Sequence, residues 1–236
     1  ILSGPGALGF GLGSALAELD YLVGDKTDNS WLEAPVSSVL LPNNKKLLLT
    51  KLDSCVNNIN DKNQSITVKW KVCTDSNQVE ETLLHHILER LPQNSFLRID
   101  ANTGWNRQQA NHWANYFIKD PRLEWLEQPL PANDIEGLLA LSRKVPVALD
   151  ESLITNPGLK NSWEGWQVRR PALEGDPRIL LKELRNGKRH IAISTAFETG
   201  IGRRWIHHLS ALQQKTATPT APGLALEWCP VSSLFS

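Results

Sequence analysis

The chain has 236 residues, of which 41% are hydrophobic and 21% are charged, and its formal net charge is zero. This length and composition suit one large domain with a sizeable core. The balanced charge argues against a nucleic-acid partner and favours a small-molecule one. Apolar runs fall short of the roughly 18 residues that a membrane-spanning helix needs, so we expect no membrane segment.

The three cysteines, Cys55, Cys73 and Cys229, are odd in number and form no CxxC pair. This pattern argues against a disulfide framework or a structural zinc site and favours a reducing cytoplasm. No signal peptide is recognisable. The sequence begins at Ile1 and contains no Met, and we expect that residues of the full protein are absent from it.

After a Gly-rich stretch that turns helical within the first twenty residues, the hydrophobic pattern alternates between period two and a helical period. In chain order it predicts a strand at 36–41, a helix at 45–60, a strand at 66–72, a helix at 77–91, a strand at 96–100, a helix at 106–119, a strand at 123–127, a helix at 134–143, a strand at 145–150, a strand at 166–170, a helix at 177–186, a strand at 190–194, a helix at 201–214 and a weaker strand near 217–221.

This alternation of strands and helices predicts an α/β protein with a parallel sheet. About eight strand units in one chain favour a closed (β/α) barrel over an open sheet. In such barrels the chemistry lies at the carboxyl ends of the strands. The polar residues at those positions are therefore the candidates for a functional site.

Three carboxylates stand at the ends of successive predicted strands. Asp100, Glu127 and Asp150 are spaced by 27 and 23 residues, about one strand-helix unit per step. Carboxylates that point into one cavity repel each other unless a cation lies between them. Ligation by oxygen atoms alone suits a hard ion such as Mg²⁺. The alternative is that each carboxylate caps a helix or pairs with an arginine.

Positive residues are expected on the same side of the strands. Lys69 and Lys71 are two residues apart, so they share one face of their strand. Burial and a neighbouring ammonium group lower the pKa of a lysine, which makes it a usable general base. The alternative is a solvated pair at a strand end. Arg170 closes a later strand and is always protonated, so it can only act as a fixed cation.

A lysine base, a divalent metal and a fixed cation together suggest one reaction class. The metal would bind a carboxylate of the substrate, and the lysine would remove the proton on the neighbouring carbon. The metal would then stabilise the enediolate that forms.

Four segments resemble the muconate-lactonising subgroup of the enolase superfamily, a superfamily whose sites are a standard example of this chemistry. They are Lys69-Trp-Lys71, Asp100-Ala-Asn-Thr-Gly-Trp105, Glu124-Trp-Leu-Glu-Gln-Pro129 and Ala148-Leu-Asp-Glu-Ser152. The resemblance runs from about Gly9 to Gly223 and implies a modified TIM-type (β/α) barrel over residues 23–236. It also implies that residues 1–22 are the helix that links the barrel to an N-terminal α+β capping domain, which is largely missing from this chain.

The resemblance assigns roles position by position. It implies Mg²⁺, with Mn²⁺ as an alternative, held by Asp100, Glu127 and Asp150. Lys71 would be the base, and Lys69 would tune its pKa. The positions that would support these groups or meet a small-molecule carboxylate substrate are Asn102, Glu151, Ser194 and Gly223.

One departure from the family pattern narrows the expected activity. Arg170 stands where the family usually has a lysine, and racemases need acid-base groups on both faces of the substrate. The resemblance therefore favours the subgroup's dehydratase branch, which serves menaquinone and phylloquinone biosynthesis in the cytoplasm. A cycloisomerase, an N-succinylamino acid racemase and a non-catalytic barrel remain alternatives, and a homo-oligomer is compatible with each.

Overall fold

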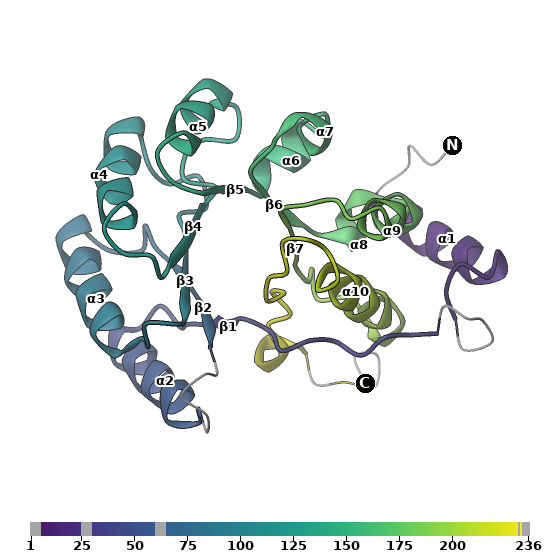
Figure 1. Ribbon diagram of the computed structural model, residues 1–236, viewed down its shortest axis with the longest axis horizontal. Coiled ribbons are helices and arrows are strands. Elements are labelled where there is room, and N and C mark those ends of the chain that lie inside the picture. Colours follow the sequence, from purple (N-terminus) through teal and green to yellow (C-terminus); the bar gives the residue numbers. More distant parts are fainter. Residues whose placement is uncertain (1–5, 25–29, 60–64, 231, 233–236) are drawn as a thin grey trace. The chain divides into compact units, whose positions relative to one another are not determined.

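The computed structural model describes residues 6–24, 30–59, 65–230 and 232, and it has an α/β fold with parallel strands (Figure 1). The chain divides into two compact units. One is Ser38–Gln167, and the other combines Ile1–Ser37 with Val168–Ser236. The strands follow one another in the sheet in their chain order, from β1 to β7. The predicted α/β class with a parallel sheet is therefore confirmed.

The unit Ser38–Gln167 contains most of the sheet. Its elements are β1 (Val39–Leu40), α2 (Lys45–Asn57), β2 (Thr67–Lys71), α3 (Asn77–Arg90), β3 (Phe96–Asp100), α4 (Arg107–Phe117), β4 (Leu123–Glu127), α5 (Ile135–Ser142), β5 (Val147–Leu149), α6 (Glu151–Thr155), α7 (Leu159–Ser162) and the first half of β6 (Trp166–Arg169). Helices α2 to α5 lie on one side of these strands (Figure 1). The opposite face of the strands is the one on which the sequence predicts the polar side chains of a functional site.

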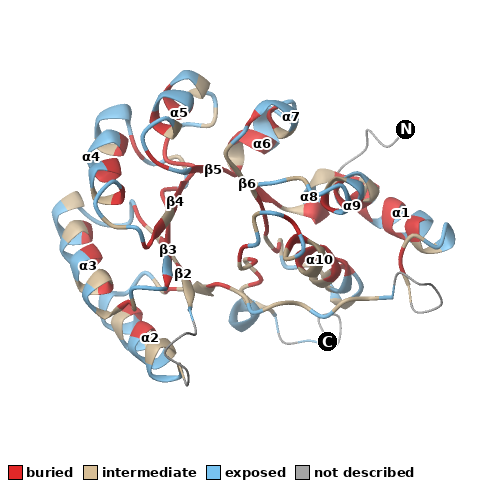
Figure 2. Cartoon of the chain, viewed as in Figure 1, coloured by how far each residue is buried: buried red, intermediate tan, exposed pale blue. Residues whose placement is uncertain are grey.

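Alternation along the strands separates an apolar face from a charged one. Val68 and Trp70 on β2, and Leu97 and Ile99 on β3, belong to a buried apolar cluster shared with the helices. The residues between them are charged, as expected for side chains that alternate across a pleated strand. Figure 2 shows buried residues on the strands and on the strand-facing sides of α3 and α4. The helix-covered face therefore stabilises the sheet, and the opposite face carries the charged residues.

Most predicted boundaries agree with the structure to within a few residues, and β3 and β4 have the predicted bounds. The strand predicted at 36–41 is shorter, because only Val39 and Leu40 pair with β2. Val36 is 85% exposed, so no packing holds that end of the segment in the sheet. Helix α2 ends at Asn57, and residue 60, its predicted end, lies outside the described residues.

The unit made of the two chain ends has its own core. Its elements are α1 (Gly6–Leu19), the end of β6, α8 (Pro171–Glu174), α9 (Pro177–Arg185), β7 (Ile191–Ile193), α10 (Gly200–Gln213) and a 3₁₀ helix at Leu226–Trp228. A second buried apolar cluster centres on Leu180, Ile191 and Trp205. A Cβ at Gly13 would lie 2.4 Å from Asp176 Oδ1, so the Gly-rich start of the chain allows α1 to pack closely at the start of α9.

The weak strand predicted near 217–221 is wrong, because no strand is formed over those residues in the described part of the chain. The backbone there is bonded to a side chain instead. Gln213 Nε2 donates to the Thr218 carbonyl at 2.8 Å, and Thr220 N donates to Gln213 Oε1 at 3.2 Å. A single parallel bridge between Ser194 and Gly223 follows later in the chain. These residues thus form a loop that ends in that bridge.

Two smaller expectations concern membranes and cysteines. Across the described ranges, every helix is too short or too polar to cross a lipid bilayer. Cys55, Cys73 and Cys229 are all free thiols, as their spacing predicted.

His208 on α10 is buried and predicts a loss of stability in acid. Its Nδ1 accepts a hydrogen bond from Leu32 N at 3.3 Å, and Trp31 packs edge-on at 5.4 Å. Burial, with smaller contributions from Arg185 and Lys215, lowers the pKa of His208 to about 4. Because the unfolded state binds the proton more tightly, with a pKa of about 6.5, the stability contribution is complete above that pH and is lost as the pH falls towards 4.

We therefore expect the free energy of unfolding to fall by roughly 2–3 kcal/mol from His208 alone between pH 7.5 and pH 4. His208→Gln keeps an acceptor for Leu32 N and removes the titrating group, so its unfolding free energy should depend less on pH. Urea unfolding of both proteins at the two pH values measures this difference. Equal pH dependence in the two proteins would show that His208 does not cause the loss.

Candidate metal centre

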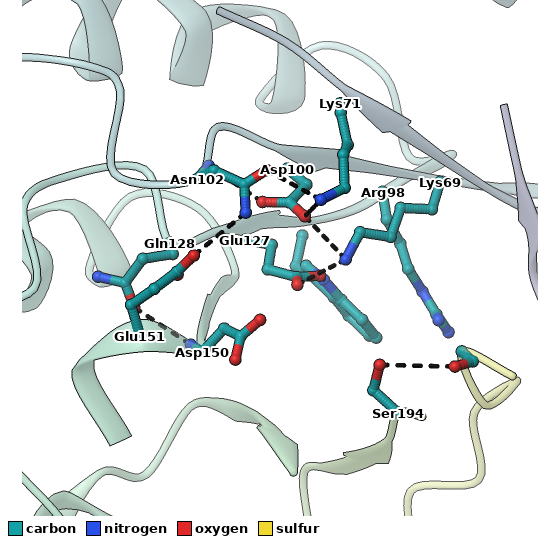
Figure 3. A network of polar contacts seen from close by, with 12 residues as sticks. Lys69, Lys71, Arg98, Asp100, Asn102, Glu127, Gln128, Asp150, Glu151 and Ser194 are labelled. Atoms are coloured by element: carbon teal, nitrogen blue, oxygen red, sulfur yellow. Dashed lines mark hydrogen bonds and ion pairs between the residues drawn. The ribbon is translucent and has the colours of Figure 1, made fainter. Parts of the chain in front are cut away.

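The three predicted carboxylates lie at one edge of the sheet in the unit Ser38–Gln167. Asp100 and Glu127 are the last residues of β3 and β4 and are direct neighbours in the strand register. Glu127 is paired with Ala148 on β5, and Asp150 follows two residues later on the same face. The three residues are only 0%, 1% and 3% exposed. Figure 3 shows their side chains directed toward one another from neighbouring strands.

Lys69 connects two of these carboxylates. Its ammonium nitrogen lies 2.6 Å from Glu127 Oε1 and 2.9 Å from Asp100 Oδ2 (Figure 3). Burial alone would lower the pKa of Lys69, but the charges of Glu127 and Asp100 and their hydrogen bonds outweigh burial and raise it. Lys69 therefore remains protonated, which is the opposite of the lowering expected for a buried lysine pair.

Lys71 occupies a different environment on the same face. Its side chain is 39% exposed, compared with 14% for Lys69, and its ammonium nitrogen lies 3.8 Å from Asp100 Oδ2. It donates a hydrogen bond to Asn102 Oδ1 at 3.2 Å. Lys71 is thus the more accessible amine of the two.

The carboxylates carry more negative charge than Lys69 neutralises. Burial raises the pKa of Glu127 to about 7, and repulsion from Asp100 and Asp150 adds to the shift although Lys69 opposes it. Asp100 Oδ2 forms ion pairs with both lysines but no well-aligned hydrogen bond. Oxygen atoms that are buried, anionic and incompletely bonded suit a hard divalent cation.

As the side chains stand, no group of three His, Cys, Asp or Glu residues within the described residues encloses a position for an ion. The Lys69 ammonium group lies between Asp100 and Glu127 and pairs with both. The donor set nevertheless fits Mg²⁺ by its chemistry, since it supplies three buried carboxylates at successive strand ends. The roles of these residues as ligands remain predictions.

Asn102 and Glu151, which the resemblance placed beside the ligands, are hydrogen-bonded to each other. Asn102 Nδ2 donates to Glu151 Oε1 at 3.1 Å, and the backbone N–H of Asn102 donates to Asp100 Oδ1 at 3.0 Å. Burial, and then repulsion from Asp150 and Asp100, raises the pKa of Glu151, while Asn102 opposes the shift. Asn102 therefore links the amine of Lys71 to Glu151 and also supports Asp100.

Gln128 is a residue that the sequence reasoning did not single out. It is fully buried, and its Oε1 accepts hydrogen bonds from Asp150 N at 3.1 Å and Ser152 N at 3.0 Å. Its Nε2 donates to Leu130 O and to Ser152 Oγ. This network fixes the backbone at the end of β5 and so positions Asp150. Gln128 directly follows Glu127 in the segment Glu124–Pro129, and this position is the sequence signal that could have identified it.

Arg170, Ser194 and Gly223 belong to the other unit. Arg170 donates from Nη1 to the Thr195 carbonyl at 3.2 Å, and its backbone N–H donates to Glu174 Oε1 at 2.8 Å. Ser194 and Gly223 form the isolated bridge, with Ser194 Oγ at 3.5 Å from Gly223 O. A Cβ at Gly223 would lie 3.3 Å from that hydroxyl oxygen. Arg170 thus lies near β7, and its role as a fixed cation stays a prediction.

The segment that carries the carboxylates matches a known family model. Residues 57–164 match the sequence model of the family described as "Enolase C-terminal domain-like". This segment contains both lysines and all three carboxylates of the candidate metal centre. The resemblance to the enolase superfamily that the motifs predicted is confirmed.

Two curated enzymes are similar to the chain in sequence. The chain is 37% identical over 153 residues to o-succinylbenzoate synthase of Thermosynechococcus vestitus, which covers 61% of this chain and 48% of the relative. An N-succinyl-L-Arg/Lys racemase of Bacillus cereus is 26% identical over 132 residues, or 55% of this chain and 33% of the racemase. The chain thus spans half or less of the length of these curated relatives.

A solved structure agrees with the sequence comparison. The crystal structure of o-succinylbenzoate synthase from Thermosynechococcus elongatus, complexed with Mg in its active site, is similar with a TM-score of 0.75 and 28% identity. The similarity covers 97% of this chain and 71% of that chain. The sequence resemblance, which pointed to the dehydratase branch of the subgroup, is therefore confirmed as a resemblance to o-succinylbenzoate synthases.

Proposed function

We propose that the chain provides the catalytic domain of a Mg²⁺-dependent o-succinylbenzoate synthase. Such an enzyme dehydrates 2-succinyl-6-hydroxy-2,4-cyclohexadiene-1-carboxylate to 2-succinylbenzoate. The observation that carries the proposal is the cluster of Asp100, Glu127 and Asp150 beside Lys71 at one edge of the sheet. The similarity to o-succinylbenzoate synthases supports this substrate over others in the superfamily.

In the proposed site, Asp100, Glu127 and Asp150 would hold Mg²⁺, with Mn²⁺ as an alternative. When bound, the ion supplies positive charge that stabilises the negative charge developing on the substrate carboxylate. Gln128 keeps the backbone of Asp150 in place for this role. Lys69 is paired with two of the carboxylates and remains protonated, so it contributes positive charge rather than a base.

Lys71 would carry the proton transfers. Its amine would remove the proton from the carbon next to the substrate carboxylate. The hydroxyl group on the adjacent ring carbon would then leave, and Lys71 would return the proton to it as water forms. The ring loses one hydrogen and one hydroxyl group as water, so a single lysine can act first as the base and then as the acid. Asn102 holds the amine of Lys71 through its Oδ1.

Arg170 supports a dehydratase over a racemase. Its guanidinium group is always protonated, so it cannot exchange protons with the second face of a substrate. We propose that it stabilises the electron-rich ring, with Ser194 and Gly223 forming loops near the substrate. The alternative of an N-succinylamino acid racemase is favoured only by the similarity to the Bacillus cereus enzyme.

We further propose that the strands belong to a modified (β/α) barrel covering residues 23–236, that residues 1–22 link it to a capping domain, and that the protein acts in the cytoplasm on a small-molecule carboxylate. These points follow from the same resemblance. A homo-oligomer would be compatible with them.

The test uses the full-length protein, purified and freed of metal. With Mg²⁺ added, the cyclohexadiene absorbance should disappear as 2-succinylbenzoate forms, and EDTA should stop the reaction. Incubation with N-succinylamino acids in heavy water tests the alternative, because a racemase would exchange deuterium at both faces. If Mg²⁺ supported neither reaction, the non-catalytic alternative would replace the proposal.

A further inference from the structure

Trp125 lies on the same strand as Glu127, one of the proposed ligands of the candidate metal centre. It precedes Glu127 by two residues on β4, so both side chains are on the same face. Its indole Nε1 donates to Glu127 Oε2 at 3.5 Å, and the residue is 1% exposed. Glu127 Oε1 accepts from Lys69 at 2.6 Å. The two carboxylate oxygens of Glu127 are thus each held by a different donor.

This use of the indole N–H differs from that of other buried tryptophans in the described residues. Four of them have an Nε1 atom without any hydrogen-bond partner, and they are Trp105, Trp113, Trp163 and Trp205. Each of these four belongs to an apolar core cluster, whereas Trp125 belongs to neither cluster. Trp125 packs instead against Trp166, with ring centres 4.8 Å apart, and its indole N–H faces a carboxylate rather than an apolar core.

Arg98 fixes Trp125 from the neighbouring strand. It pairs with Trp125 in the strand register, and its guanidinium carbon lies 4.1 Å from the centre of the indole ring. Arg98 is itself held by Glu124, with Nε donating to Oε2 at 2.7 Å, and its side chain is 3% exposed. A cation over an aromatic face draws electron density from the ring. It should therefore strengthen the N–H as a donor to Glu127.

We propose that Trp125, held by Arg98 and Glu124, is a positioning residue that orients the carboxylate of Glu127 for the metal ion. The inference rests on the proposed metal site but not on the identity of the substrate. Groups that hydrogen-bond to metal ligands from outside typically change metal affinity by 10-fold to 100-fold when they are removed. Because the bond is long, we expect an effect of roughly 10-fold.

The test is Trp125→Phe in the full-length protein, which retains an aromatic ring under Arg98 and removes the N–H. Mg²⁺ binding measured by isothermal titration calorimetry should weaken by roughly 10-fold relative to the wild type. Trp113→Phe is the matched control, because Trp113 is fully buried and its Nε1 has no partner. That control should leave the Mg²⁺ dissociation constant unchanged even where it lowers the thermal midpoint.

A spectroscopic readout separates positioning from general stability. In protein labelled with fluorotryptophan, the resonance that disappears in Trp125→Phe should shift when Mg²⁺ is added, and the one that disappears in Trp113→Phe should not. Arg98→Lys provides a second variant if Trp125→Phe does not fold. It keeps a positive charge beside Glu124 and loses the guanidinium plane over the indole ring, so Mg²⁺ binding should again weaken.

The outcomes separate this inference from the function on which it rests. If the wild type binds Mg²⁺ and both variants bind it equally well, the positioning role of Trp125 is wrong and the metal site stands. If the wild type binds no Mg²⁺, the metal site fails, and the role of Trp125 fails with it. If Mg²⁺ binding weakens as expected but the cyclohexadiene substrate is not turned over, only the substrate assignment is wrong.

Discussion

Lys71→Met is expected to reduce kcat by about 10²–10⁴-fold, the range typical for loss of a general acid-base group. Methionine nearly matches the length of the lysine stem but has no amine to accept or return a proton. Lys71 is 39% exposed and its ammonium nitrogen lies 3.8 Å from Asp100 Oδ2, so its removal should cost little stability. Steady-state turnover and Mg²⁺ titration of the same sample measure the two effects.

Two comparisons make this result specific to Lys71. Lys119→Met changes an exposed lysine on the surface and should leave kcat unchanged. Lys69→Met should instead lower the thermal midpoint in EDTA, because it removes the ammonium group that is paired with Glu127 and Asp100. If kcat of Lys71→Met stayed within about twofold of the wild type, another group would have to be the base.

The sequence predicted the faces of the strands better than it predicted the contacts on them. Period-two alternation placed Lys69 and Lys71 on one face and Val68 and Trp70 on the other, and the structure has this division. The reason is that strand geometry is local, so each residue's side of the sheet follows from its position alone.

Contacts between strands depend on register and packing, which local patterns do not contain. The state of Lys69 shows this, because its pKa is set by Glu127 and Asp100 on two other strands. The Arg98–Trp125 pairing likewise depends on a register shift between β3 and β4 that no periodicity reports.

The ends of the sheet were predicted least well, for a related reason. The strand predicted at 36–41 pairs with β2 only through Val39 and Leu40, and Val36 is exposed. Near 217–221 the backbone is satisfied by the side chain of Gln213 rather than by a neighbouring strand. Backbone groups must be bonded when they are buried, but a sequence does not say whether a strand or a side chain provides the partner.

Asp150→Asn should have opposite effects on stability with and without metal. Without metal, burial raises the pKa of both Glu127 and Glu151, and repulsion from the charge of Asp150 adds to each shift. Removing that charge should stabilise the fold in EDTA. Asp150 begins α6 without a side-chain capping bond, so the amide should not weaken the helix start. A gain of about 1 kcal/mol would raise the thermal midpoint by about 2–4 °C for a chain of this size.

The pH at which the melts are compared matters, because the charge of Glu127 changes with pH. The pKa of Glu127 in the folded state, about 7, is above its ordinary value in the unfolded chain. The folded state therefore binds the proton more tightly, and the stability that this provides is complete below about pH 4 and is lost as the pH rises through 7. The repulsion that Asp150→Asn relieves is then largest near pH 8, and the melts in EDTA should be compared at that pH.

With Mg²⁺ present, the wild type should instead be more stable than Asp150→Asn. A ligand present at about 100 times its Kd stabilises the folded wild type by about 2.7 kcal/mol, whereas a variant with one ligand fewer should gain much less. Asp134→Asn is the control, since Asp134 caps α5 and pairs with Arg107 outside the carboxylate cluster. It should lower the thermal midpoint equally in EDTA and in Mg²⁺. If Asp150→Asn behaved in the same way, Asp150 would be a structural residue and the three-carboxylate metal site would be wrong.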